Sequence, residues 1–139
     1  MRKVILRVLG ILLILLVAIE LTTCSIQSKA ERGEGYNQSD SILYHIITDS
    51  DIKKAPRISH DYYFKYQARD GSAAEQSTII FRKTTDSSSL KPYLATLGYH
   101  FAEKEGDSEH WEKNSSVSSS YYLWVNRETN EVGLSKATY

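Results

Sequence analysis

Cysteine is nearly absent from the chain: Cys24 is the only one among its 139 residues. A disulfide within the chain and a zinc site built from several cysteines are therefore excluded. An excess of basic charge is also lacking, because 17 Lys and Arg residues balance 17 Asp and Glu residues. Nucleic-acid binding requires a basic surface that neutralises phosphates, so we expect no nucleic-acid partner.

Sequence motifs for nucleotide, metal and catalytic sites are missing as well. The chain contains no G-x-G-x-x-G, G-x-x-x-x-G-K-[ST] or H-E-x-x-H sequence and no EF-hand loop, so no nucleotide partner is expected. Two S-x-x-K matches, at 50–53 and 88–91, lack the K-T-G and S-D-N sequences that accompany this spacing in penicillin-binding enzymes. His100 and His110 can meet across a predicted hairpin, but a metal needs three or four ligands. We expect a protein that is not an enzyme and holds no metal or cofactor.

The longest apolar run, at residues 8–19, follows three basic residues at positions 1–7. A basic start, a short apolar stretch and small polar residues after it are typical of a secretory signal. The basic residues stay on the cytoplasmic side by the positive-inside rule. The sequence therefore predicts that residues 1–24 form a signal peptide or membrane anchor and that residues 25–139 lie outside the cytoplasm.

Three fates of this segment remain open. Residues 21–24 (LTTC) resemble the lipobox of bacterial lipoproteins, which makes Cys24 the candidate lipid attachment site, although Thr23 stands where Gly, Ala or Ser is usual. Residues 4–23 alternatively form an uncleaved helix of about 30 Å, long enough to span a bilayer. Ordinary cleavage is the third alternative, for which no A-x-A sequence is present. In general character the segment resembles that of short exported proteins of the bacterial cell envelope, held on the periplasmic side by a lipid or by a single membrane pass.

Behind this segment, composition predicts a linker at 25–40, rich in Ser, Gly and alternating charge, and a single domain at 41–139. Residues 41–54 fit a helix better than a strand, because Ile and Leu recur at helical spacing. Residues 88–97 form the clearest predicted helix, since one apolar stripe runs along it. Gly98 suits the end of that helix, because glycine adopts positive φ without penalty.

Alternating apolar and polar residues predict strands in the rest of the domain. The expected strands lie at 60–69, 78–84, 99–103, 109–113, 121–126 and 131–135, with a serine-rich loop at 114–120. The first two strands should pair as a hairpin. The sequence thus predicts an α+β fold: an N-terminal signal or anchor helix, then a small domain with an antiparallel β-sheet and one or two packed helices.

Aromatic residues are unusually abundant, with ten Tyr and two Trp in the chain. Tyr63, Tyr122 and Trp124 fall on the outward sides of predicted strands, and they share one face only if the strand registers align. Tyr and Trp bury a large area at low entropic cost, so such a face is a candidate partner-binding surface. The alternative is that a second layer, such as the N-terminal helix, covers these rings.

The predicted hairpin at 103–113 is a second candidate surface, because it carries five acids against two lysines. Its candidate partner-binding residues are Glu103, Glu105, Asp107, Glu109 and Trp111. The acids would attract a basic partner. The alternative is a solvated hairpin that contributes Trp111 to the core.

These features lead to the hypothesis of a non-catalytic, membrane-tethered envelope protein that binds or inhibits another protein. One alternative is an accessory structural subunit of an envelope complex, in which the apolar segment itself makes contacts. The other is a small hydrolase that pairs Asp61 or Glu109 with a histidine. An exposed aromatic patch favours the first hypothesis, and a pocket with perturbed carboxylates favours the last.

Intact mass and membrane fractionation of the native protein test the fate of the N-terminus. The lipobox predicts a mature chain that begins at Cys24, carries added acyl mass and fractionates with membranes. Cys24→Ser should abolish the added mass, because the thiol is the atom that is acylated. A full-length mass that the substitution leaves unchanged would contradict the lipobox and make the helix a permanent membrane segment.

Overall fold

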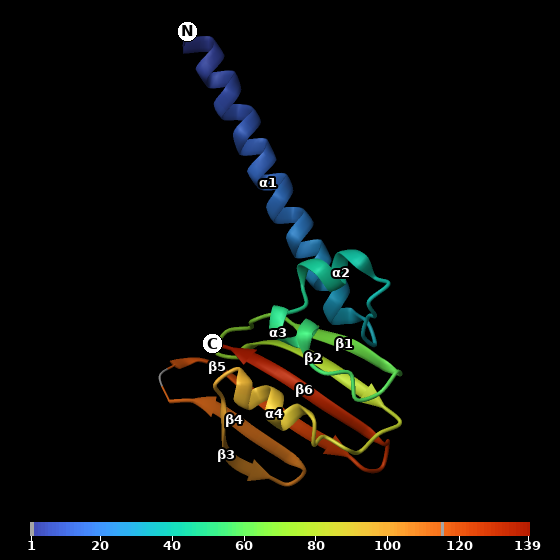
Figure 1. The fold of residues 1–139 in the computed structure, drawn as a ribbon. Coiled ribbons are helices and arrows are strands. Elements are labelled where there is room, and N and C mark those ends of the chain that lie inside the picture. The colour runs from blue at the N-terminus through green and yellow to red at the C-terminus, as the bar shows by residue number, and fades with distance from the viewer. Residues whose placement is uncertain (1, 115) are drawn as a thin grey trace.

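The computed structural model describes residues 2–114 and 116–139; Met1 and Ser115 fall outside the described residues. It contains a long N-terminal helix and a domain in which short helices pack on a six-stranded sheet (Figure 1). In chain order the elements are α1 (Arg2–Arg32), α2 (Ser41–Ile46), α3 (Ser50–Lys54), β1 (Tyr62–Gln67), β2 (Glu75–Arg82), α4 (Leu90–Thr96), β3 (His100–Glu105), β4 (Ser108–Lys113), β5 (Ser116–Asn126) and β6 (Glu131–Thr138).

The sheet is antiparallel throughout, with the strand order β1-β2-β6-β5-β4-β3. β1 and β2 form the hairpin that the sequence predicts. The connection through α4 then carries the chain to the far edge at β3, and β6 returns to the centre between β2 and β5 (Figure 1). An apolar N-terminal helix followed by an antiparallel sheet with a few helices confirms the predicted α+β fold.

One face of the sheet, which we name the inner face, carries the core. Phe64, Ile79, Leu134 and Leu123 lie opposite one another on four neighbouring strands, and each is at most 1% exposed. Successive side chains of a strand point to opposite faces, so the chain neighbours of these four residues lie on the other face. The core thus runs as a continuous band across the middle of the sheet.

Helices α3 and α4 cover the inner face (Figure 1). The stripe predicted for 88–97 is confirmed, because Leu90 and Leu94 of α4 are fully buried in the same core cluster. Gly98 follows with a φ of +83°, a left-handed conformation that glycine adopts without strain. Ile52 of α3, also fully buried, completes the cover.

The segment 41–54 is two helices rather than the single one expected. Helix α2 ends at Ile46, and Asp49 is the N-cap residue of α3. The Asp49 carboxylate accepts a hydrogen bond from the Asp51 backbone N–H at 2.8 Å. Thr48 also turns inward, where its hydroxyl lies 2.9 Å from the Tyr36 hydroxyl. The break buries Leu43 and Tyr44 of α2 while α3 packs on the sheet.

The expected loop at 114–120 is also different, since β5 already begins at Ser116. Ser119 and Ser120 pair with Thr138 and Ala137 of β6. Serine has little intrinsic preference for strands, but the backbone hydrogen bonds offered by a neighbouring strand override that preference. The register of β6, which local sequence does not reveal, therefore extends β5.

The predicted linker at 25–40 is built into the domain. Helix α1 continues without a break to Arg32, and Ala30 near its end is buried. The Ala68 backbone N–H donates to the Glu31 carboxylate at 2.7 Å, which ties the helix to the end of β1. Tyr36 is 3% exposed and pairs with Phe64 as an additional edge of the sheet. The segment predicted as a linker thus continues α1 to Arg32 and makes hydrogen bonds and packing contacts with the edge strand β1.

Leu94→Ala should lower the free energy of unfolding by about 2–5 kcal/mol, because it removes a fully buried side chain and leaves a cavity. Leu97→Ala is the matched control, since Leu97, the C-cap residue of the same helix, is only partly buried. Urea unfolding of the full chain in detergent micelles measures both. A loss for Leu97→Ala as large as that for Leu94→Ala would contradict the packing of α4 described here.

Candidate functional site

The second face of the sheet, which we name the outer face, lies opposite α3 and α4 (Figure 1). Strand pairing aligns its side chains in rows that cross the sheet. One row holds Tyr63, Ile80, Gly133, Trp124 and Ser108, and the next holds Lys65, Thr78, Ser135, Tyr122, His110 and Glu103. The registers therefore do align, and Tyr63, Tyr122 and Trp124 lie on one face.

Trp124 lies flat on the sheet because its cross-strand neighbour is glycine. A Cβ atom at Gly133 would lie only 2.0 Å from Cε2 of the Trp124 ring. Any side chain at this position would push the ring away from the backbone. Ile80, on the other side of Gly133, is 5% exposed although it belongs to the outer face. Trp124, Gly133 and Ile80 thus form a flat apolar centre.

Tyr122 and His110 form a second ring pair beside this centre. Their rings stack at 4.9 Å with an interplanar angle of 15°. The Tyr122 hydroxyl lies 3.3 Å from that of Tyr139, and this hydrogen bond together with partial burial raises the pKa of Tyr122. The protonated phenol gives the otherwise apolar ring a hydroxyl group that can hydrogen-bond a partner.

Charge differs between the two ends of the outer face. At the β1 end, the Arg82 guanidinium lies 4.3 Å from the centre of the Tyr63 ring, and Lys65 Nζ lies 5.8 Å from the same ring. At the other end, Glu103 and Glu105 project from β3. Asp107 is exposed in the adjoining turn. Arg82 also lies 3.7 Å from the Glu131 carboxylate. The face thus combines an end of mixed charge, an aromatic centre and an acidic end.

Two of the residues proposed from sequence do not belong to this surface. Trp111 is 8% exposed and packs in the core, with its ring 6.1 Å from that of Phe101. Glu109 faces the inner side, where it pairs with Lys91 Nζ at 2.7 Å. Alternation along β4 explains the correction, because Trp111 and Glu109 project to the face opposite His110.

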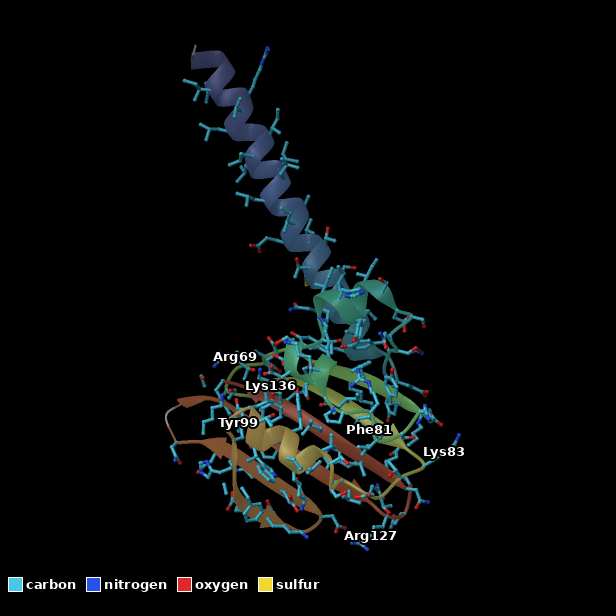
Figure 2. The ribbon with its side chains drawn as sticks, in the orientation of Figure 1. Arg69, Phe81, Lys83, Tyr99, Arg127 and Lys136 are labelled. Atoms are coloured by element: carbon cyan, nitrogen blue, oxygen red, sulfur yellow. The ribbon has the colours of Figure 1, made fainter. Side chains whose placement is uncertain are left out.

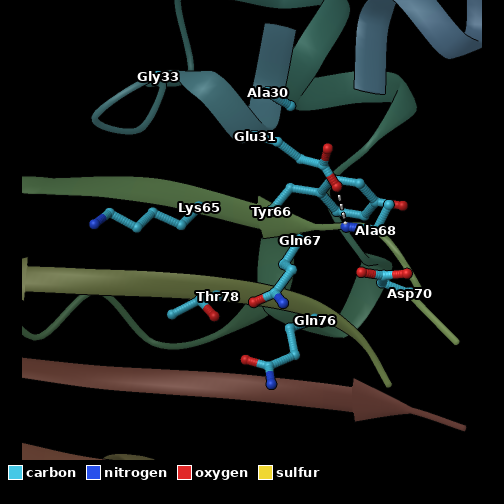
Figure 3. Close-up of a pocket in the computed structure, with 10 residues that line it drawn as sticks. All are labelled: Ala30, Glu31, Gly33, Lys65, Tyr66, Gln67, Ala68, Asp70, Gln76 and Thr78. Atoms are coloured by element: carbon cyan, nitrogen blue, oxygen red, sulfur yellow. Dashed lines mark hydrogen bonds between the residues drawn. The ribbon is translucent and has the colours of Figure 1, made fainter. Parts of the chain in front are cut away.

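A cavity of about 470 Å³ lies where the outer face meets the end of α1 (Figure 3). Figure 3 shows the side chains of Lys65, Gln67, Gln76 and Thr78 on β1 and β2 below Glu31 of α1. The lining is mainly polar, with two side-chain amides and both signs of charge. These groups can hydrogen-bond a peptide that reaches this margin of the outer face.

A second cluster of charged groups lies on the inner face. Lys136 Nζ of β6 donates to Asp49 Oδ2 at 3.0 Å and to Asp51 Oδ2 at 2.8 Å. The Tyr121 hydroxyl donates to Asp51 Oδ2 at 3.1 Å. Sequence reasoning missed this cluster, because Lys136 is 87 residues from Asp49 in the chain and no local pattern links them.

The pKa directions in this cluster favour a structural role. Burial opposes the charge on Asp51, but hydrogen bonds and charge from Lys136 and a hydrogen bond from Tyr121 hold its pKa below the ordinary value. Burial likewise opposes the charge on Lys136, yet Asp51 and Asp49 raise its pKa. A general base needs a raised carboxyl pKa and a nucleophilic lysine needs a lowered one. The cluster shifts both groups the other way and fastens α3 to the sheet.

The histidine-carboxylate pairs of the hydrolase hypothesis are not brought together. Asp61 pairs with Lys83 at 2.9 Å, and Glu109 pairs with Lys91. His110 and His100 lie 3.7 Å from Glu103 and Glu112, respectively. Within residues 2–114 and 116–139, no group of three or more His, Cys, Asp or Glu side chains is placed to hold a metal ion.

The candidate lipid attachment residue, Cys24, is exposed on α1, and the helix continues through it. Within α1, the segment Ile5–Ser28 is long and apolar enough to cross a membrane, and none of its most apolar part is buried in the protein. The N-terminal helix is therefore compatible with a signal or a single-pass anchor.

Lys136→Met should destabilise the full chain at pH 7, because it leaves Asp49 and Asp51 without their cation. Breaking a buried ion pair costs about 3–5 kcal/mol; these side chains keep some contact with water, so we expect about 1–3 kcal/mol. Since the folded pKa of Asp51 is lowered, its stabilisation is present above the unfolded value and is lost as the pH falls below about 4. The difference between variant and wild type should therefore shrink in acid.

Urea unfolding in micelles at pH 7 and pH 3 measures this difference. Lys83→Met is the matched control: Lys83 also pairs with an aspartate, but its side chain is 81% exposed, so no measurable change is expected. A Lys136→Met deficit that is equal at both pH values would contradict the assignment.

Comparisons with protein-family models, with curated protein sequences and with solved structures found no match to this chain. The outer face and the inner-face cluster are therefore interpreted from their own geometry.

Proposed function

We propose that the protein is a non-catalytic, membrane-tethered binding protein of the bacterial cell envelope, and that the outer face of its sheet binds and inhibits another protein. The observation that carries the proposal is the alignment of Tyr63, Trp124 and Tyr122 on the face opposite the helices. Half-buried aromatic rings with polar tips are enriched at binding hot spots, because they bury a large area and lose few rotamers.

The tether is supported by the surface of α1. From Ile5 to Leu21 its large apolar side chains are half or more exposed, a surface that water disfavours and a bilayer accepts. Three basic residues, Arg2, Lys3 and Arg7, precede the apolar run and favour the cytoplasmic side. The domain then stands on the periplasmic side, whether lipid on Cys24 or α1 itself holds it there.

The sheet extends away from the tether. α1 contacts the edge strand β1, and β3 forms the opposite edge (Figure 1). Five inter-strand intervals of about 4.8 Å separate the two edges by about 24 Å. The mixed-charge end of the outer face is therefore proximal to the membrane and the acidic end is distal, so a partner in the periplasm reaches the acidic end first.

The chemistry of the face defines the partner. Trp124 and Ile80 around Gly133 fit an apolar or aromatic side chain of a protein surface. Glu103 and Glu105 would attract a basic patch and speed its association, an effect that salt weakens. A basic protein with an exposed apolar residue at the centre of its contact patch, such as a secreted hydrolase or toxin, meets both requirements.

Site-specific photo-crosslinking in native membranes tests the proposal. Lys65 lies on the outer face (Figure 3), opposite the inner-face Lys136 that Figure 2 labels. A photoreactive residue at Lys65 should crosslink to one protein of discrete mass. The same residue at Ala95, exposed on α4 on the opposite side, is the matched control and should not. Trp124→Ala should weaken the binding by about 2 kcal/mol or more, roughly thirtyfold, and abolish the adduct at equal expression.

Equal adducts from Lys65 and Ala95, or an adduct that survives both Trp124→Ala and Tyr122→Ala, would contradict binding by the outer face. An adduct from Leu13 in the apolar segment, with none from Lys65, would instead favour an accessory subunit that contacts its complex through α1. The observation that favours this second function is that α1 continues without a break to Arg32 and is hydrogen-bonded to the end of β1 through Glu31.

A further inference from the structure

Helix α2 leaves two large apolar side chains uncovered. It buries Leu43 and Tyr44, but Ile42 and Ile46 are 62% and 61% exposed. A spacing of four residues places both isoleucines on the same side of the helix. Outside α1, the large apolar residues with comparable exposure among the described residues are Phe101 and Tyr139. The short helix α2 therefore concentrates apolar surface that the domain itself does not use.

The position of α2 suggests what covers this surface. An open groove is lined on one side by Leu21, Cys24 and Ser28 of α1 and on the other by Asp40 and Leu43 at α2. Figure 1 shows α2 beside the lower part of α1, on the side of the domain from which α1 emerges. Helix α2 thus lies beside the C-terminal part of the segment Ile5–Ser28 that is suited to cross a membrane.

The length of α1 sets the depth of α2. Twenty residues of helix span about 30 Å, the thickness of the hydrocarbon core. Counted from Ile5, the start of the apolar segment, twenty residues end at Cys24. A lipid attached to Cys24 would place the same residue at the same boundary. Because α2 lies level with Leu21 and Cys24, either tether brings it to the headgroup region.

The junction between α1 and the domain keeps α2 at that depth. Besides the bond from Ala68 to Glu31, Gln27 Nε2 donates to the Tyr66 hydroxyl at 3.4 Å. Tyr36 exchanges backbone hydrogen bonds with Phe64, so the segment between α1 and α2 is fixed to the sheet edge. These contacts leave α2 little freedom to move away from the membrane.

We propose that α2 lies in the bilayer interface and that Ile42 and Ile46 contact lipid, so that the domain is docked on the membrane and not merely tethered to it. The inference rests on the membrane attachment in the proposed function, and it does not depend on the identity of the protein partner. The occupant is lipid because the exposed isoleucines belong to a helix that shares a groove with Leu21 and Cys24 of the apolar segment Ile5–Ser28. Docking holds the strands in one orientation, with the outer face accessible from the side.

Depth-dependent fluorescence quenching tests the docking. Full-length chain with Cys24→Ser and one new cysteine carries an environment-sensitive NBD label, in vesicles of phosphatidylethanolamine and phosphatidylglycerol with or without shallow doxyl-labelled lipid. Labels at Ile42→Cys and Ile46→Cys should lose at least half of their emission to the doxyl group. Phe101→Cys is the matched control, because Phe101 is also half exposed but lies on β3, the strand farthest from α1, and should not be quenched. Ile11→Cys, within α1, reports insertion and should be quenched by deep doxyl lipid.

Failure of the docking and failure of the tether give different results. If Ile11 is quenched while Ile42 and Ile46 behave like Phe101, α2 does not touch lipid and the inference is wrong, although the tether stands. If Ile11 is not quenched, α1 does not insert in the bilayer, and the docking proposed here is wrong together with the single-pass attachment. If labels at Ile42 and Ile46 emit in the blue without quenching by lipid, a protein surface or a second copy of the chain covers α2 and the lipid contact is excluded.

Discussion

A six-stranded sheet has two faces, and the helices of this chain cover only one of them. A domain of this size needs at least one covered face to bury a sufficient core, and Leu90 and Leu94 of α4 provide that cover. The outer face is then left without a covering helix, and its large rings pack flat against the sheet or against another ring. Trp124 rests on Gly133, and Tyr122 stacks on His110. The proposed binding surface is thus a consequence of which face the helices leave open.

Contacts within the chain also restrict the orientation of the domain in the proposed attachment to the membrane. A flexible linker would leave the outer face free to turn toward any partner or toward the bilayer itself. Here α1 runs directly to the sheet edge, and hydrogen bonds at Glu31 and Tyr36 make helix and domain one body. Orientation reduces the conformations that a partner must select, which lowers the entropic cost of binding. Ile42 and Ile46, docked in the interface, would strengthen this restriction.

Charge is distributed in two ways that match these roles. On the inner face Lys136 forms ion pairs with both Asp49 and Asp51. Its charge therefore holds α3 against the sheet and is not available to a ligand. At the distal edge Glu103 and Glu105 are exposed, and their field extends into solvent. Charges that hold the fold together are thus kept apart from those that can attract a basic protein over the Debye length of about 8–10 Å.

The sequence alone determined the apolar α1 segment, the antiparallel α+β class and the helix around Leu94, because each depends on composition or on a short-range period. The alternation along the sequence also placed Tyr122 and Trp124 on the same side of their strand. Tertiary structure decided that Tyr63 lies on the same face as these two rings, and that Trp111 is in the core instead of on a binding surface. It also brought residues of the expected linker at 25–40 into hydrogen bonds with the edge of the sheet. Strand register and edge pairing are contacts between residues far apart in the chain, so local patterns carry no information about them.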